Sequence, residues 1–295
     1  MIGTRFIISP SQIEDFQLCP LRWYNNRKKV ERGPASMALL RGSAVHDAWE
    51  QFVNTPVKKR SSELLQANLS LAWNSLAEEE TAKGRDLSDP KEEKSWQKGR
   101  AESRKLLEKY WEEFGQDSAV TSGESEKTLS MNFGEFDLQA RLDYWILERR
   151  DIDRASVVYE LKTTGRSPNQ MYYTYFMPQL RYQALLASEA APNAITEPIV
   201  YVTVLWPNGA VRLEKIVLTS ELGRTYDEVY RLGKAMMRTS QMNLLEVEER
   251  AHEGYHCSWC PHFDSCRRRL GGGFADTGLD ISGKYDIMVE PKEAE

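Results

Sequence analysis

Apolar and polar positions follow two different rhythms along the chain, and each rhythm predicts one kind of secondary structure. Through residue 114, apolar side chains recur every three or four positions, which is the spacing of amphipathic helices. Ser9-Pro10-Ser11 opens the first predicted helix, which ends near Leu18, before Cys19-Pro20. Gly42-Ser43 precedes a second helix, and residues 61–114 predict further helices with a polar break around 83–90.

After this region the apolar positions alternate as they do in strands. Three consecutive strands are predicted over residues 127–133, 137–147 and 156–163. The next elements are a helix over 169–190, which Pro178 kinks or divides, and strands over 199–205 and 211–218. Ser220 caps a last helix that ends near residue 237. This order predicts an α/β fold in which helices flank a central sheet.

Composition and charge narrow the class of protein. A chain of 295 residues that is 41% hydrophobic can bury the core of one large domain, with or without an appendage. The 39 basic and 44 acidic residues give a net charge of -5, which excludes a polycationic nucleic-acid coat but permits a local basic groove. No apolar run approaches the length of a membrane span, and the N-terminus is a poor signal peptide. We therefore expect a cytoplasmic protein without a membrane partner.

The first candidate for chemistry is an acid–lysine pattern on two neighbouring predicted strands. Asp143 lies in one strand, and Glu160-Leu161-Lys162 lies in the next, where alternation points Glu160 and Lys162 the same way. Carboxylates inside such apolar strands are costly unless they are paired or bind a metal ion. Two of them, with the Leu161 carbonyl, suit a hard divalent cation beside which Lys162 stabilises developing negative charge. The competing interpretation is a surface Glu160–Lys162 pair on a solvent-facing strand.

Two predicted helices carry further candidates. His46 follows Arg41-Gly42-Ser43 on a half-apolar helix, where a neutral imidazole can complete a metal site or serve only in packing. Gln179 and Tyr182 lie about one turn apart on the helix after the Glu160 strand, where they can meet DNA or Lys162. The competing interpretation of that pair is a polar stripe on the surface of the helix.

The four cysteines form the remaining candidate site. Three are clustered, as Cys257, Cys260 and Cys266, and Cys19 is far from them in the sequence. Four thiolates suit zinc or a cubane iron–sulfur cluster, and the C-x2-C spacing is typical of metal binding. His256 or His262 can replace Cys19 in a zinc site. Free buried cysteines are the alternative without metal.

Taken together, these motifs resemble the RecB-like branch of the PD-(D/E)XK nucleases, in particular the members that carry an iron–sulfur cluster. That group includes CRISPR-associated RecB-like exonucleases, AddB nuclease domains and several phage exonucleases. The resemblance covers about residues 5 to 270 and rests on the order of its motifs, which are Ser9-Pro-Ser-Gln, Cys19-Pro-Leu-Arg-Trp-Tyr, Arg41-Gly-Ser-Ala-Val-His46, Arg141-Leu-Asp143, Glu160-Leu-Lys162, Gln179-Leu180 and the cysteine triplet.

The resemblance implies a restriction-endonuclease-like core with a mixed central sheet and an iron–sulfur cap. We expect one nuclease domain over residues 1–270, a helical insertion at about 61–114 and a tail over 271–295. The cluster-binding segments are expected at about 19–32 and 257–269. The cap would join the two ends of the chain.

The same resemblance implies the roles of the candidate residues. His46, Asp143, Glu160 and the Leu161 carbonyl would hold Mg²⁺ or Mn²⁺, and Lys162 would assist catalysis with Gln179 beside it. Cys19, Cys257, Cys260 and Cys266 would ligate a structural [4Fe-4S] cluster. One departure concerns the helix glutamine: the family places a tyrosine four residues later, whereas this chain has Gln183 there and Tyr182 one residue earlier.

These roles predict a metal-dependent deoxyribonuclease, an exonuclease acting on single strands or duplex ends, with a helicase or recombination protein as a possible partner. The residues expected to bind DNA are mainly basic and lie in two segments; they are Arg22, Arg27, Lys28, Lys29, Tyr182, Arg267 and Arg268. Two alternatives remain open from the sequence. One is a DNA-end-binding or helicase-associated accessory protein that cleaves weakly or not at all, and the other is a zinc-stapled interaction protein.

Overall fold

The computed structural model describes residues 5–28, 35–115, 120, 123–150, 153–191, 194, 197–254, 256–257, 260–263 and 266. The chain forms two compact units. The first comprises residues Met1–Glu14 and Pro34–Met237, and the second comprises Asp15–Gly33 and Arg238–Glu295. Each unit therefore draws on both an early and a later part of the chain.

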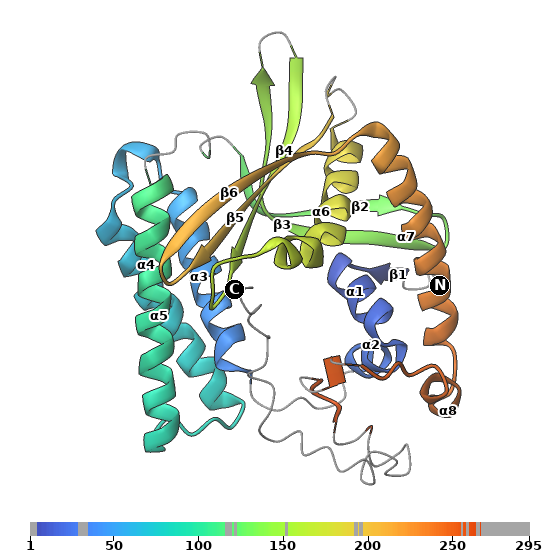
Figure 1. Cartoon of the computed structure of the whole chain (residues 1–295), viewed down its shortest axis with the longest axis horizontal. Helices are drawn as coiled ribbons and strands as arrows, with labels where there is room; N and C mark the ends of the chain where they lie inside the picture. Colours follow the sequence, from blue (N-terminus) through green and yellow to red (C-terminus); the bar gives the residue numbers. More distant parts are fainter. Residues whose placement is uncertain are drawn as a thin grey trace, which may run out of the picture. The chain divides into compact units, whose positions relative to one another are not determined.

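The first unit is built on a six-stranded sheet (Figure 1). Its strands are β1 (Phe6–Ile8), β2 (Glu124–Asn132), β3 (Phe136–Arg150), β4 (Asp153–Thr163), β5 (Ile199–Trp206) and β6 (Gly209–Ile216). The spatial order is β1-β3-β4-β5-β6, and β2 also pairs with β3. β1 with β3 and β4 with β5 are parallel, whereas the other pairs are antiparallel. The predicted mixed central sheet is thereby confirmed.

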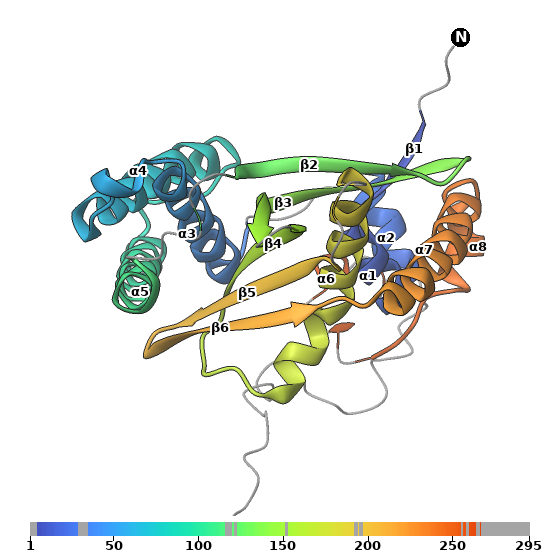
Figure 2. The same cartoon turned by 90° about the horizontal axis from the view of Figure 1, so that it is seen from above.

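Helices cover the two faces of this sheet. The main apolar core joins the sheet to α3 (Met37–Val53), α4 (Ser62–Ala82) and α5 (Pro90–Phe114), through residues such as Trp49, Tyr144 and Leu161. α6 (Gln170–Ala190) lies against the other face, where the Ser156 hydroxyl donates to the Ala187 carbonyl at 3.0 Å. Figure 2 shows α3, α4 and α5 grouped together on the side of the sheet away from α6.

α7 (Thr219–Ser240) packs beside the β2–β3 turn. The Tyr226 ring stacks on Phe133 with 4.7 Å between centroids, and Gly233 lies directly against the Phe136 ring. A Cβ atom at residue 233 would lie 2.2 Å from that ring, so only glycine permits this close approach. The contact fixes α7 near the start of β3.

The second unit contains α2 (Pro20–Arg27), α8 (Leu244–Glu248) and the cysteine-rich segment. The helix α1 (Pro10–Leu18) runs from the first unit into it. The Tyr24 hydroxyl of α2 donates to the Met242 carbonyl at 3.1 Å, which joins chain segments 218 residues apart. His262 and Asn26 make a second such link at 2.9 Å.

Most predicted elements are present, one predicted helix start is corrected, and three short elements were not predicted. α3 begins at Met37, capped by the Ser36 side chain, so Gly42-Ser43 lies inside the helix and does not precede it. β1, α2 and α8 were not predicted, because elements of three to eight residues are too short to show a clear period. Among the described residues, no helix combines the length and apolar character needed to cross a bilayer.

Candidate active site and cysteine pocket

Asp143 and Glu160 meet where the pairing of β3 with β4 ends. The last backbone pair of this ladder is Tyr144 with Tyr159, so the next residues, Asp143 and Glu160, share the opposite face of the sheet. The Asp143 carboxylate then accepts a hydrogen bond from the Leu161 backbone N–H at 2.8 Å. The Asp143 side chain thus replaces a backbone acceptor beyond the end of the ladder, and the two carboxylates lie on one face of the sheet.

Glu160 is 3% exposed, and three side chains bind its carboxylate. Lys162 Nζ approaches Oε1 at 2.6 Å, and Gln179 Nε2 donates to the same oxygen at 3.0 Å. Gln183 Nε2 donates to Oε2 at 2.8 Å, and Lys162 also donates to Gln179 Oε1 at 3.0 Å. These contacts exclude the solvent-facing interpretation of the Glu160–Lys162 pair.

His46 of α3 reaches the same site from another element. Its Nδ1 atom lies 3.4 Å from Asp143 Oδ2, and 28% of the imidazole remains exposed. The structure therefore brings together all four predicted side chains, which are His46, Asp143, Glu160 and Lys162.

The electrostatics of the site follow from two buried carboxylates next to one lysine and one histidine. Burial and the Asp143 charge both raise the pKa of Glu160. Burial opposes ionisation of Asp143, but His46 and Lys162 together hold its pKa below the ordinary value. Burial likewise opposes protonation of His46, yet the adjacent Asp143 carboxylate raises its pKa. The site therefore has more negative charge than Lys162 alone can offset.

This donor set fits a hard divalent cation. Carboxylate oxygens, a backbone carbonyl and one imidazole suit Mg²⁺ or Mn²⁺, and a cation between the carboxylates relieves the repulsion that raises the Glu160 pKa. Within the described part of the chain, no three His, Cys, Asp or Glu side chains are arranged as a ready metal site. In the carboxylate site these donors instead bind Lys162, the glutamines and the Leu161 N–H, so metal binding requires an exchange of partners.

An open groove of about 800 Å³ reaches the two glutamines. Its polar lining comes from the start of α1, from β2 and β3, and from α6, and it comprises Ser9, Ser11, Thr128, Gln139, Arg141, Gln179 and Gln183. The Gln183 side chain is buried beside Glu160, and its Oε1 atom has no hydrogen-bond partner among the described residues. The groove therefore reaches a glutamine whose acceptor oxygen is buried next to the carboxylates.

The structure corrects the predicted role of Tyr182. This side chain is 0% exposed, and its hydroxyl donates to Glu228 at 3.2 Å, so it cannot contact DNA in this conformation. Burial and the Glu228 charge raise its pKa. Gln183, which occupies the family's tyrosine position, is the residue that contacts Glu160. Residues 179 and 183 are four apart and thus share a helix face, but Tyr182, three residues after Gln179, satisfies the same spacing rule.

The predicted basic surface is only partly described. Arg22 forms an ion pair with Asp15 at 2.9 Å and is 15% exposed, so it is not the free cation that a DNA contact requires. Arg27 lies over the Trp23 ring at 5.9 Å, and Lys28 over the Tyr24 ring at 5.3 Å. Lys29, Arg267 and Arg268 lie outside the described residues.

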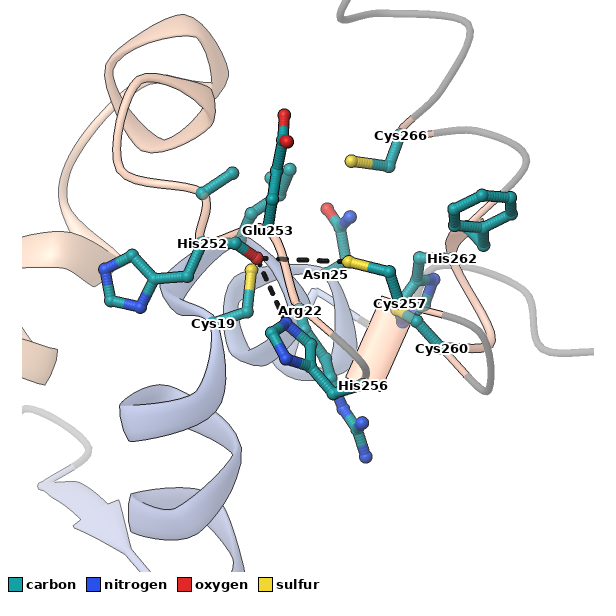
Figure 3. Close-up of a pocket in the computed structure, with 13 residues that line it drawn as sticks. Cys19, Arg22, Asn25, His252, Glu253, His256, Cys257, Cys260, His262 and Cys266 are labelled. Atoms are coloured by element: carbon teal, nitrogen blue, oxygen red, sulfur yellow. Dashed lines mark hydrogen bonds between the residues drawn. The ribbon is translucent and has the colours of Figure 1, made fainter. Parts of the chain in front are cut away.

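The four cysteines line one cavity in the second unit (Figure 3). Cys19 caps the start of α2, and Cys257, Cys260 and Cys266 belong to the C-terminal segment. Burial and then the neighbouring thiols raise the pKa of Cys266 to about 11. Burial also raises the pKa of Cys260, with Cys19 and Cys257 adding to the effect. All four thiols are therefore neighbours, and a bound cation would stabilise their ionised form.

Two of the three histidines that line this cavity, His256 and His262, already have partners at one ring nitrogen. His256 Nε2 lies 3.0 Å from the His252 carbonyl, and His262 Nε2 lies 2.9 Å from Asn26 Oδ1. Four sulfur atoms from two chain segments thus line one cavity, and four thiols are a suitable set of ligand types for a metal or cluster, but these described side chains are not arranged as a ready metal site.

Comparisons with known proteins agree with this geometry. The sequence matches the PD-(D/E)XK nuclease superfamily over residues 7–267, and the chain belongs to that superfamily. Membership implies a nuclease that hydrolyses phosphodiester bonds of DNA, and nucleases of this superfamily typically use divalent metal ions.

Among solved structures, the chain is similar to a putative exonuclease from Eubacterium rectale, with a TM-score of 0.51 and 13% identity over 92% of this chain and 94% of that chain. It also matches the structure named SSO0001, with a TM-score of 0.41 and 14% identity over 92% and 90% of the two chains. The former likeness supports the fold alone. No curated protein matches the sequence at a significant level.

Proposed function

We propose that the protein is a divalent-metal-dependent deoxyribonuclease of the RecB-like branch, which removes nucleotides from single strands or duplex ends. One observation carries this proposal: Asp143, Glu160 and Lys162 converge on one face of the sheet, with His46 beside them. A buried pair of carboxylates with a lysine is the donor set that phosphodiester hydrolysis needs.

His46, Asp143, Glu160 and the Leu161 carbonyl are the groups that would hold Mg²⁺ or Mn²⁺ at this site. The ion would supply Lewis acidity, lowering the pKa of a water molecule and offsetting phosphate charge. The Asp143 hydrogen bond from the Leu161 N–H fixes the carboxylate in position before any substrate arrives.

The protein's own side chains supply the remaining steps. When water attacks the phosphorus atom, a new P–O bond forms and the bond to the leaving oxygen breaks. The attacking water loses one proton to solvent, and the leaving oxygen takes up one proton from solvent. The Lys162 ammonium stabilises the negative charge that grows on the phosphate oxygens. The Gln183 amide donates to Glu160 and orients its carboxylate, and Gln179 binds both Lys162 and Glu160.

The cysteine pocket is proposed to hold a [4Fe-4S] cluster with a structural role. Four thiols supplied by both parts of the second unit support this assignment, since ligating them to one cluster would cross-link Cys19 to the C-terminal segment. Protein purified without air should be brown and contain about four iron and four sulfide per chain. Stoichiometric zinc in its place would overturn the cluster assignment.

A degradation assay tests the proposed activity. Wild-type protein with Mg²⁺ or Mn²⁺ should shorten end-labelled single- and double-stranded DNA progressively, and EDTA should stop it. Glu160→Gln keeps the size of the side chain but removes its charge, so cleavage should be lost. Wild-type rates in that variant, free of contaminating nuclease, would overturn the assignment, whereas binding of DNA ends without cleavage would indicate an accessory protein.

A further inference from the structure

The helical insertion contains a second groove, between α4 and α5. It has a volume of about 740 Å³, and its lining combines one row of residues from each helix. The α4 row is Gln66, Leu69, Ser70 and Trp73, and the α5 row is Gln97, Arg100, Ala101 and Arg104. None of these residues belongs to the carboxylate site or the cysteine pocket.

The groove contains two arginines, Arg100 and Arg104. Arg5, Arg41, Arg85 and Arg141 all form ion pairs with carboxylates. Arg100 and Arg104 form none with any described residue, although Glu102 lies between them in the sequence. Glu102 instead binds Arg41 of α3 on another side of the helix. The Glu102 carboxylate thus does not line the groove, whereas Arg100 and Arg104 do.

No carboxylate lines the groove. The Ser70 hydroxyl donates to the Gln66 carbonyl and the Gln66 amide donates to the Arg104 carbonyl, so the two arginines are the groups that would attract an anion. Trp73 is 1% exposed, and its indole Nε1 has no hydrogen-bond partner among the described residues. Arg100 and Arg104 lie one helical turn apart, so both guanidinium groups can reach one oxyanion or two successive ones.

We propose that the α4–α5 groove is a phosphate-binding site that holds the backbone of a nucleic-acid strand away from the carboxylate site. The claim that the ligand is a nucleic-acid strand rests on the proposed function, whereas the claim that the groove binds phosphate rests only on the residues that line it. A strand anchored at two places, the groove and the carboxylates, would stay bound while its end is processed. This gives the insertion over residues 61–114 a role in substrate binding.

Binding of a fluorescently labelled single-stranded oligonucleotide in EDTA tests the proposal without cleavage. The double variant Arg100→Ala/Arg104→Ala should bind about tenfold more weakly, because it loses charge-assisted hydrogen bonds. The slope of affinity against salt should fall by about 1.4, the value for two phosphate contacts on a single strand. Lys105→Ala is the matched control: it removes one positive charge from the same helix but does not line the groove, so affinity should change little.

A second titration distinguishes a nucleic-acid strand from free inorganic phosphate as the ligand of the groove. The indole N–H resonance of Trp73, assigned with Trp73→Phe, should shift with both the oligonucleotide and inorganic phosphate, but not with chloride at equal ionic strength. A shift with phosphate alone, together with unchanged oligonucleotide affinity in the double variant, would overturn the strand as ligand. No shift with either would overturn the site itself.

These outcomes are independent of cleavage. A protein that cuts no DNA but shows the arginine-dependent binding would contradict the proposed activity and keep the phosphate site. If the wild type cleaves DNA normally but the double variant and the control bind the oligonucleotide equally well, the result would contradict the phosphate site and keep the proposed activity. Unchanged melting temperatures of the variants confirm that the fold is intact.

Discussion

The carboxylate site and the cysteine pocket both gather groups that suit metal ions, but they balance charge differently. In the carboxylate site, Lys162 and His46 offset Asp143 and Glu160, so opposite charges hold the site together. In the cysteine pocket, the four thiols are alike, and burial together with neighbouring thiols raises the pKa of Cys260 and of Cys266. The first site can therefore persist without metal, whereas the proposed cluster would supply most of the cohesion of the second.

The largest effect is expected from breaking the first site. Asp143→Asn removes one charged ligand and should lower the cleavage rate about a thousandfold, since metal stabilisation of the transition state is worth several kcal/mol. The fold should survive, because the amide oxygen can still accept from the Leu161 N–H. Single-turnover kinetics and a melting curve measure the two quantities. Lys162→Ala is the comparison, which should lose turnover but keep Mn²⁺ binding.

Breaking the second site should affect stability before activity. Cys19→Ser should lower the melting temperature and the iron content as much as Cys257→Ser does, although Cys19 lies 238 residues earlier (257 - 19). A cross-link between distant segments restricts the unfolded chain, which is the physical reason for an effect from either end. Full iron content in the Cys19→Ser protein would show that another residue, with His256 and His262 as candidates, completes the site.

A smaller effect should come from the glutamine that sequence reasoning did not assign. Gln183→Leu removes the hydrogen bond to Glu160 and the buried acceptor, and it should reduce cleavage about 10- to 100-fold, as loss of a ligand-orienting group does. Gln183→Glu adds a third carboxylate and should be worse. Tyr182→Phe is the matched control on the same helix, and its cleavage rate should stay near that of the wild type.

The smallest expected effect is a pH dependence of the metal-free protein. The folded-state pKa of His46 is raised by Asp143, so its contribution to stability is complete below about 6.5 and is lost as pH rises through the raised value. The loss should be about 1 kcal/mol or less, because the imidazole is partly exposed. Denaturant unfolding in EDTA at several pH values measures it. In His46→Ala this pH dependence should disappear, and persistence there would assign it to other groups.

The two regions also differ in how far the sequence predicts them. Asp143, Glu160 and Lys162 could be predicted because strand alternation is a local property that fixes which side chains share a face. From the sequence, a contact of Glu160 with Gln183 could not be distinguished from a contact with Tyr182, because both residues lie within a turn of Gln179. In the structure Tyr182 binds Glu228, and Gln183 binds Glu160. The start of α3 was misplaced because Gly42-Ser43 resembles a helix boundary, whereas Ser36 provides the actual cap.

For the cysteines, the sequence predicts the ligand types but not the surroundings. The C-x2-C spacing identifies the segment, and the fold brings Cys19 to the same cavity. The ion pair of Arg22 with Asp15 was not predicted, because it depends on the turn between α1 and α2. A basic sequence therefore does not by itself establish a basic surface.

One measurement tests the central claim that the chain carries two separate metal sites, one for catalysis and one for structure. Iron content and Mn²⁺ binding are determined on the same anaerobic samples of wild type, Glu160→Gln and Cys257→Ser, with Mn²⁺ followed by the paramagnetic resonance of the free ion. Glu160→Gln should lose Mn²⁺ binding and keep about four iron per chain, and a soluble Cys257→Ser protein should lose iron while its carboxylate site still binds Mn²⁺. Unchanged Mn²⁺ binding in Glu160→Gln, or wild-type protein without iron, would contradict the account.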